Sequence, residues 1–229
     1  MAQIPLPLVL GKHSRFETFV RGENDAVVAH LQALRSGSDP EILWLWGPEG
    51  SGKSHLLQAT CAGITAQRVM YLPLRAAQAS GAEVLQGLET LDMLALDDVD
   101  AVSGDADWDQ ALFGLYNRMQ AERGHLIFAA RRAPANTQFS LPDLASRAGG
   151  AAVYQLRPLN DERLLLALQG HANARGLDLR DAAARYLLAR VSRNMGAICQ
   201  WLDELDTASL VAKRKLTIPF IRAAMTERS

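Results

Sequence analysis

The sequence predicts an α/β domain, in which helices cover both faces of a parallel sheet, followed by a small all-helical domain. Short apolar runs alternate with helical patterns as far as residue 156, and a glycine-rich turn joins the first run to the helix that follows it. After Pro158 the strand patterns stop, and the remaining apolar residues recur at helical spacing. We therefore expect an α/β domain of residues 11–157 and a helical domain of residues 158–229.

The strands of the α/β domain are expected where short apolar runs are bounded by polar or turn residues. These runs occupy residues 42–46, 68–74, 93–96, 125–130 and 152–156. Asn24 can cap a helix that runs to about residue 34, and Asp105 can begin another whose apolar residues share one face. The other helices of this domain are expected at residues 53–63, at about residues 78–88 and in a short segment that begins at Pro142.

The helical domain begins with its own capping signal. Asn160 precedes two acidic residues, a pattern typical of a helix N-terminus, and the helix is expected to end before Gly176. Further helices are expected at residues 181–191, 195–211 and 219–225. Four short helices of this kind can bury their apolar faces only against one another.

The turn after the first strand has the pattern of a phosphate-binding loop: glycine, four residues, then Gly-Lys-Ser. Glycines let the backbone amides approach phosphate groups, and the helix that follows presents unpaired N–H groups to an anion. The lysine would reach the outer phosphates, and the serine hydroxyl would help to hold Mg²⁺. The alternative is a glycine-rich turn that binds nothing, but the full pattern in this context favours a site for ATP or ADP. The predicted nucleotide-binding residues are Gly47, Pro48, Glu49, Gly50, Ser51, Gly52, Lys53 and Ser54.

Two acidic residues end the third predicted strand. Asp97 is expected to hold Mg²⁺ together with Ser54, and Asp98 to orient or activate the attacking water. Such a pair alone is a weak signal, because adjacent acids also cap helices. The preceding phosphate loop, with one strand and two helices between, makes the metal interpretation the better one.

The composition limits the kinds of partner. The 229 residues carry 24 Lys and Arg against 25 Asp and Glu, which argues against nucleic-acid binding through an overall basic field. The two cysteines, Cys61 and Cys199, are far apart in apolar helical surroundings and are expected to be buried in a reducing compartment. No run approaches the roughly 18 apolar residues of a membrane span, and no signal peptide pattern begins the chain. We therefore expect a cytoplasmic location and no membrane partner.

At this point the sequence resembles a known family. The segments Gly-Pro-Glu-Gly-Ser-Gly-Lys-Ser-His-Leu-Leu (47–57) and Leu-Asp-Asp (96–98), with the helical C-terminal domain, are similar to the AAA+ module of the DnaA replication-initiator family. Three more segments narrow the resemblance to the DnaA-homologous regulators that inactivate DnaA: Leu-Tyr-Asn-Arg (115–118), Leu-Pro-Asp-Leu-Ala-Ser-Arg (141–147) and Arg-Lys-Leu-Thr-Ile-Pro-Phe (214–220). The resemblance implies an AAA+ P-loop NTPase fold with a helical lid, and it places His55 beside the nucleotide, where we expect it to pack.

The first ten residues are apolar but contain Pro5 and Pro7, which favours an extended segment. From the residues alone, this is a tail packed on its own domain, a disordered start or a peptide presented to a partner. The resemblance implies a peptide that binds the DNA polymerase III sliding clamp. The binding residues would be Gln3, Leu6, Pro7 and Leu8. DNA would then be reached indirectly, through the clamp, and the protein would associate with the nucleoid.

The resemblance also assigns arginines to the site. Arg147 matches the arginine finger, which would act in trans; the alternative is a surface arginine at a helix end. Two sensor positions depart from the family pattern. Arg131 stands where a polar residue is usual, and Gly196 stands where an arginine contacts phosphate, with Arg193 one turn earlier as the candidate contact. We therefore expect this protein to bind nucleotide and to hydrolyse it weakly or not at all.

These inferences lead to one main hypothesis and two alternatives. The main hypothesis is a negative regulator of DNA replication initiation, tethered to the sliding clamp, that stimulates hydrolysis of DnaA-bound ATP. The first alternative is a stand-alone AAA+ ATPase similar to a helicase loader. The second is a DnaA-like adaptor with nucleotide in a purely structural role. A homo-oligomer is possible in each. DnaA itself reads DNA with a helix-turn-helix domain after its AAA+ module; no such domain is expected here, which agrees with the near-neutral charge, so we expect that the chain does not recognise an origin by itself.

Overall fold

The computed structural model describes residues 14–36, 39–64, 67–192, 195–212 and 216–227. These residues form two compact units. The first contains the stretch up to Phe16 and residues 23–48 and 53–157, and the second contains residues 17–22, 49–52 and those from Pro158 onward. The proposed clamp-binding residues Gln3, Leu6, Pro7 and Leu8 lie outside the described residues, as does Arg193, so their roles stay predictions.

Among the described residues of the first unit, five parallel strands form one sheet in the order β2-β3-β4-β1-β5. The strands are β1 (Ile42–Trp46), β2 (Val69–Pro73), β3 (Met93–Asp97), β4 (His125–Ala130) and β5 (Ala152–Gln155). Every residue of β3 and β4 is buried, as expected of central strands covered on both faces. The predicted parallel sheet is confirmed.

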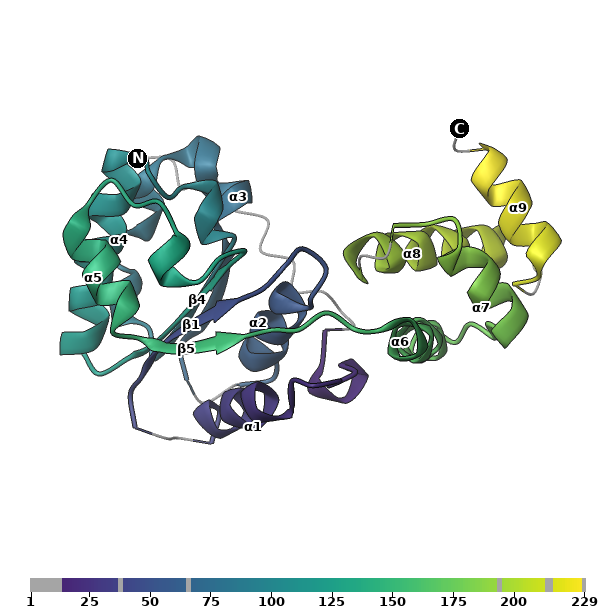
Figure 1. Cartoon of the computed structure of the whole chain (residues 1–229), viewed down its shortest axis with the longest axis horizontal. Helices are drawn as coiled ribbons and strands as arrows, with labels where there is room; N and C mark the ends of the chain where they lie inside the picture. Colours follow the sequence, from purple (N-terminus) through teal and green to yellow (C-terminus); the bar gives the residue numbers. More distant parts are fainter. Residues whose placement is uncertain (1–13, 37–38, 65–66, 193–194, 213–215, 228–229) are drawn as a thin grey trace. The chain divides into compact units, whose positions relative to one another are not determined.

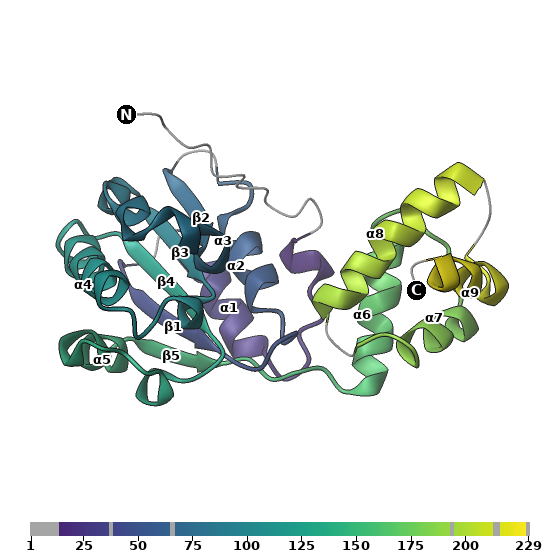
Figure 2. The ribbon, with the colours of Figure 1, turned by 90° about the horizontal axis from the view of Figure 1, so that it is seen from above.

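Helices cover both faces of this sheet (Figures 1 and 2). The helices α1 (Asp25–Leu34) and α2 (Lys53–Cys61) lie on one face, and α4 (Ala106–Ala121) and α5 (Pro142–Gly149) lie on the other. The Asp105 carboxylate caps α4 by accepting from the amides of Asp107 and Trp108. Beneath α4, the rings of Trp44 and Phe128 pack with centroids 5.5 Å apart, at the centre of the main apolar core.

The segment after β2 differs from the expected helix at residues 78–88. It consists of one turn of α-helix, α3 (Leu74–Ala77), and three separate 3₁₀ turns, η2 (Gln78–Ser80), η3 (Ala82–Leu85) and η4 (Leu88–Thr90). Gly81 and Gly87 have φ angles of +79° and +81°, which interrupt a right-handed helix. Leu85 is nevertheless buried in the core. The continuous helix was wrong because apolar spacing reports burial but not the backbone conformation of intervening glycines.

The second unit contains the helices α6 (Asp161–Asn173), α7 (Asp181–Leu188), α8 (Met195–Ala212) and α9 (Ile218–Glu227), as Figure 1 shows. The Asn160 side chain accepts a hydrogen bond from the Arg163 amide at 3.0 Å, which confirms the predicted cap. Leucines and isoleucines from all four helices form one core, which includes Leu168, Leu187, Leu202 and Ile221. The predicted helices of this unit are confirmed, with ends that differ by a few residues.

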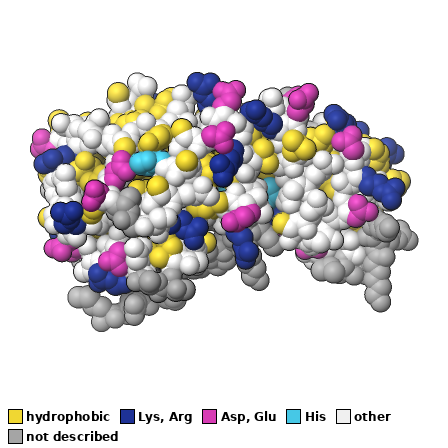
Figure 3. Space-filling view, turned by 90° about the horizontal axis from the view of Figure 1, so that it is seen from below, with side chains coloured by type: hydrophobic (Ala, Val, Ile, Leu, Met, Phe, Trp, Pro, Cys, Tyr) yellow, Lys and Arg dark blue, Asp and Glu magenta, His cyan; other side chains and the backbone are white. Residues whose placement is uncertain are grey.

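The surface and the cysteines add two observations. Figure 3 shows acidic and basic side chains interspersed over one face of the described chain, in keeping with the balanced composition. Cys61 is buried, whereas Cys199 is only partly buried, contrary to expectation.

Within the described ranges, no helix is both long enough and apolar enough to cross a membrane.

Candidate nucleotide-binding site

The phosphate loop joins the carboxyl end of β1 to the first turn of α2. Gly50 and Gly52 have φ angles of +78° and +96°, a region that side chains other than glycine rarely adopt. A Cβ atom on Gly52 would lie only 2.6 Å from Cε2 of Phe19, so the loop backbone is closely covered at this position. The pattern predicted the glycines, but nothing in the sequence indicated Phe19.

The base of the loop is held by the neighbouring strands. The Gly47 amide donates to the Ala130 carbonyl at 3.2 Å, and the Leu156 amide donates to the Trp46 carbonyl at 2.6 Å. These bonds extend the pairing of β1 with β4 and β5 by one residue. The loop therefore begins from a fixed point at the carboxyl edge of the sheet, the edge at which open α/β sheets bind ligands.

Lys53 is a buried cation within this loop. Its side chain is 7% exposed, and Nζ donates to the carbonyls of Gly47 at 2.8 Å and Pro48 at 3.0 Å. Burial is the main cause that lowers the pKa of Lys53, and the carboxylates of Asp97 and nearby acids oppose that shift. A buried ammonium held only by neutral carbonyl oxygens on its loop side is well placed to exchange them for an anion.

A second polar group of the loop is ready for a ligand. The Ser51 hydroxyl oxygen is buried and has no hydrogen-bond partner among the described residues. Unpaired buried polar atoms are rare because each costs a lost hydrogen bond. The Ser51 hydroxyl and the Lys53 ammonium are each suited to a phosphate group, so the residues present suit the nucleotide that the pattern implies.

The two residues predicted to hold Mg²⁺ are brought together. Asp97 is 2% exposed; its carboxylate accepts from the Tyr71 hydroxyl at 2.8 Å and from the Asp98 amide at 2.9 Å. The Ser54 hydroxyl also hydrogen-bonds this carboxylate. Burial is the main cause that raises the pKa of Asp97, and a bound cation would favour its ionised form. Carboxylate and hydroxyl oxygens suit Mg²⁺, which would take its other ligands from phosphate and water.

Asp98, the predicted water-orienting residue, lies beside Asp97 but faces a different partner. Its carboxylate forms an ion pair with Arg75, with 3.3 Å between Nε and Oδ2. Its backbone is left-handed, with a φ angle of +54°, so the chain turns sharply here. The action of Asp98 on water therefore stays a prediction, and the sequence analysis had not identified Arg75.

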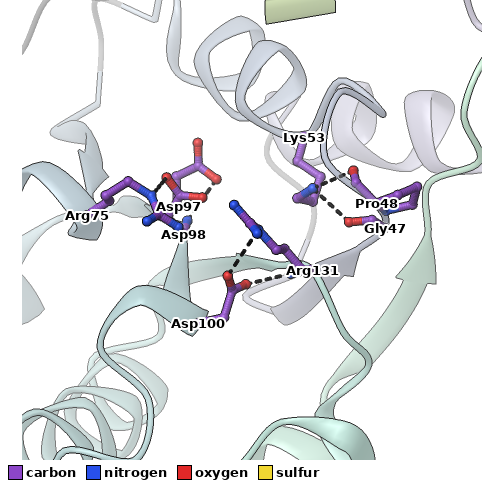
Figure 4. A network of polar contacts seen from close by, with 8 residues as sticks. All are labelled: Gly47, Pro48, Lys53, Arg75, Asp97, Asp98, Asp100 and Arg131. Carbon is purple, nitrogen blue, oxygen red and sulfur yellow. Dashed lines mark hydrogen bonds and ion pairs between the residues drawn. The ribbon is translucent and has the colours of Figure 1, made fainter. Parts of the chain in front are cut away.

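Figure 4 shows a third acid and a further arginine in the same cluster. Asp100 accepts from the Arg131 amide and forms an ion pair with its guanidinium, with 3.6 Å between Nε and Oδ2. Arg131 was expected at a sensor position after β4, and it lies beside Asp97 and Lys53. Asp100 was missed, although it stands only two residues after Asp98.

The other predicted residues do not join this cluster. Arg147 is exposed on α5, and its guanidinium carbon lies 5.9 Å from the centre of the Tyr116 ring. Tyr116 lines a cavity of about 450 Å³ with residues that precede or begin β1, β4 and β5, at the amino edge of the sheet. His55 packs near the loop and donates from Nε2 to the Arg15 carbonyl at 2.8 Å, and Gly196 lies in the first turn of α8.

Comparison with known proteins agrees with this geometry. The family model of the bacterial DnaA ATPase domain matches residues 10–149, and that of the Hda lid domain matches residues 161–225. Domain III of DnaA from Thermotoga maritima has a TM-score of 0.79 at 19% identity, over 96% of this chain and 98% of that chain.

Two further structures extend the comparison. AMPPCP-bound DnaA from Aquifex aeolicus has a TM-score of 0.67 at 27% identity, over 85% of this chain and 64% of that one. The branch migration motor RuvB from Thermotoga maritima, at 19% identity, shares the fold alone, with a TM-score of 0.62 over 88% of this chain and 68% of that one. Because the ATPase model covers more than half of the residues and the lid model most of the remainder, the chain belongs to the DnaA family of AAA+ proteins, close to Hda.

Proposed function

We propose that this chain is a DnaA-related negative regulator of DNA replication initiation, which docks on ATP-bound DnaA and supplies Arg147 to its active site. The observation that carries the proposal is the placement of Arg147, which is exposed on α5 over Tyr116, toward the amino edge of the sheet, whereas the chain's own phosphate loop begins at the carboxyl edge. A guanidinium that cannot serve its own nucleotide is available to a neighbour's. The match of the lid to that of Hda supports the same assignment.

The chemistry asked of Arg147 is electrostatic. Charge develops on the transferring phosphoryl group during hydrolysis, and a guanidinium delivered in trans accelerates the reaction by about 10³–10⁵ in other nucleotide switches. The Tyr116 ring beneath Arg147 offers a cation–π contact that limits where the guanidinium rests before docking. Arg147 thus begins from a preferred position, and no carboxylate of the described residues forms an ion pair with it.

The chain's own nucleotide, ATP or ADP, would be held by the loop from Gly47 to Ser54. Mg²⁺ would be held by Ser54 and Asp97, where it would neutralise phosphate charge. Asp98 is engaged by Arg75, so the carboxylate that was predicted to orient water is already paired. We therefore propose weak turnover at this site and a nucleotide whose main effect is on structure. The AMPPCP in the Aquifex aeolicus relative supports nucleotide binding in this fold.

Gln3, Leu6, Pro7 and Leu8 would attach the protein to the sliding clamp. An extended peptide with a polar anchor and apolar side chains can fill a groove at low entropic cost. Tethering makes the encounter with DnaA effectively intramolecular on newly replicated DNA. The protein would then act in the cytoplasm, at the nucleoid, with only indirect contact to DNA.

A second candidate is a stand-alone AAA+ ATPase. The observation that favours it is the assembled set of Lys53, Ser54 and Asp97, which a hydrolytic site requires. Single-turnover hydrolysis by the isolated protein at a rate typical of AAA+ motors would support this candidate over the regulator.

The decisive experiment measures hydrolysis of DnaA-bound ATP with clamp loaded on DNA, with and without this protein. We expect stimulation by the wild type, and its loss in Arg147→Ala. Arg180→Ala is a matched control, because it removes an exposed arginine from the other unit. If stimulation survives Arg147→Ala, the finger assignment is wrong.

A separate pull-down tests the tether. The double variant Gln3→Ala with Leu6→Ala is expected to lose clamp binding while it keeps its affinity for nucleotide. Retention of the clamp by this variant would remove the N-terminal peptide from the mechanism and leave the role of Arg147 to be judged by the hydrolysis assay.

A further inference from the structure

The backbone around Arg131 is fixed at three consecutive residues. The Ala130 carbonyl accepts from the Gly47 amide at 3.2 Å, and the Arg131 amide donates to Asp100 Oδ1 at 2.5 Å. The carbonyl of the following residue, Arg132, accepts from Trp44 Nε1 at 3.0 Å. The backbone that carries the Arg131 side chain is therefore fixed at the carboxyl end of β4, directly beside the start of the phosphate loop.

The guanidinium extends from this anchor into the charged cluster. Figure 4 shows it directed toward the space between Asp97 and Lys53. Burial is the main cause that lowers the pKa of Lys53, and the positive charge of Arg131 acts in the same direction. The Arg131 side chain is 49% exposed, so it has room to turn toward a ligand in the loop.

Asp100 is the carboxylate that Arg131 can exchange for a ligand, because the other two acids have other hydrogen-bond or ion-pair partners. Asp98 is held by Arg75, and Asp97 accepts from hydroxyl groups and an amide. The ion pair with Asp100 is long, at 3.6 Å, and Asp100 keeps the Arg131 amide as a donor if the guanidinium leaves. After departure of the guanidinium, Asp100 therefore keeps a hydrogen-bond donor, although it loses its counter-charge.

Charge and shape suit this guanidinium to phosphate. Arginine stays ionised at any relevant pH, and its planar fork can donate two hydrogen bonds to one phosphate group. A divalent ion at such a site normally supplies the positive charge that lets the phosphates approach buried carboxylates. An arginine in the same place supplies part of that charge permanently.

We propose that Arg131 is a phosphate-binding residue that partly replaces the divalent metal, by exchanging Asp100 for a phosphate oxygen of a bound nucleoside di- or triphosphate. This inference rests on the proposed binding of nucleotide in the Gly47–Ser54 loop. Its consequence is that nucleotide stays bound when the metal is removed, so binding depends only weakly on the divalent ion.

The test measures the dissociation constants of ADP and ATP with excess Mg²⁺ and again with a chelator, by calorimetry. We expect chelation to weaken binding to the wild type only slightly. For Arg131→Ala the same treatment is expected to cost at least about tenfold more, the factor for loss of one charge-assisted hydrogen bond. Arg132→Ala, which removes the same charge one residue further along, is expected to behave as the wild type.

A double variant separates binding from simple charge masking. Arg131→Ala leaves Asp100 without its guanidinium, and that carboxylate could itself repel phosphate. In Asp100→Asn with Arg131→Ala the repulsion is absent, and we expect binding to remain strongly metal-dependent. Metal-independent binding by the double variant would overturn the proposal, because Arg131 would then only mask Asp100.

The remaining outcomes distinguish this inference from the proposed function. Equal metal dependence in the wild type and in Arg131→Ala overturns the inference and leaves nucleotide binding intact. Failure of the wild type to bind nucleotide in either condition overturns both. Thermal unfolding without nucleotide confirms that each variant is folded, and Arg131→Gln, which keeps a hydrogen-bonding side chain, replaces Arg131→Ala if that variant does not fold.

Discussion

Arg131 and Arg147 belong to the same α/β unit but lie at opposite edges of its sheet. At the carboxyl edge, Arg131 is anchored by its amide to Asp100 and directed among the acids of the phosphate site. Toward the amino edge, Arg147 is exposed in the last turn of α5, where it lies over the Tyr116 ring. Arg131 thus lies within its own chain's phosphate site, whereas Arg147 is exposed at the protein surface.

The difference shows how surroundings decide the use of one side chain. A guanidinium among carboxylates is positioned by charge, and an anionic ligand that binds there can take the place of the carboxylate it pairs with. A guanidinium over an aromatic ring is held only weakly and can leave at small cost. The predictions below alter one edge at a time, from the largest expected effect to the smallest.

Arg147 is expected to require the two parallel N–H donors of its guanidinium as well as its positive charge. Arg147→Lys keeps the charge but cannot donate in parallel from two nitrogens, so we expect stimulated hydrolysis in DnaA to fall by more than about a hundredfold. The measurement is single-turnover hydrolysis of DnaA-bound ATP. Nearly full activity in this variant would mean that position 147 supplies charge alone.

A substitution at the carboxyl edge of the sheet is expected to reduce nucleotide affinity before it reduces stability. Lys53→Ala removes the buried ammonium that faces the loop carbonyls, and we expect nucleotide affinity to fall by about tenfold to a hundredfold. The thermal unfolding midpoint without nucleotide should fall little, because removal of Lys53 also removes the cost of burying a cation. Unchanged affinity would place the phosphates outside this loop.

Two glycine substitutions compare the backbone at the two edges. Gly52→Ala places a methyl group against Phe19 at a positive φ angle, and we expect a loss of about 2 kcal/mol in unfolding free energy. Gly149→Ala, at the end of α5, meets nothing within 4 Å and is expected to be neutral or stabilising by up to about 1 kcal/mol. Urea unfolding measures both, and Gly52→Ala combined with Phe19→Ala should recover the part of the loss due to the clash.

The ring beneath Arg147 is expected to make a modest contribution. Tyr116→Leu keeps the site apolar but removes the cation–π contact, so we expect stimulation of DnaA to fall by about twofold to fivefold. Tyr116→Phe retains the ring and serves as the control. A change in nucleotide affinity in either variant would contradict the separation of the two edges.

A histidine at the amino edge is expected to give the smallest effect. Burial is the main cause that lowers the pKa of His125, and Nδ1 has no partner among the described residues. The unfolded chain therefore binds this proton more readily, and stability should fall as the pH drops below about 6.5, by at most about 1.4 kcal/mol per pH unit. His125→Gln should reduce that slope in urea unfolding between pH 7 and pH 5, and an unchanged slope would show that other groups produce it.

Local patterns predicted much of this site because most of its candidate binding residues are consecutive in the sequence. The loop from Gly47 to Ser54, the strand before it and Asp97 at the end of β3 all lie where the sequence predicted them. The helix expected at residues 78–88 did not form, because Gly81 and Gly87 adopt positive φ angles that apolar spacing does not report. Boundaries elsewhere moved by up to three residues, as hydrogen bonding at helix ends is decided by nearby packing.

The sequence by itself determined the α/β fold class, the phosphate loop and the family to which the chain belongs. Only the tertiary structure decided that Asp100 pairs with Arg131, that Asp98 pairs with Arg75 and that Phe19 covers Gly52. For the two ion pairs the reason is the strand order, since β3 lies between β2 and β4 and the residues that follow these strands therefore meet although they are far apart in the chain. A local pattern records which residues can bind an anion, whereas the order of the strands decides which charges surround them.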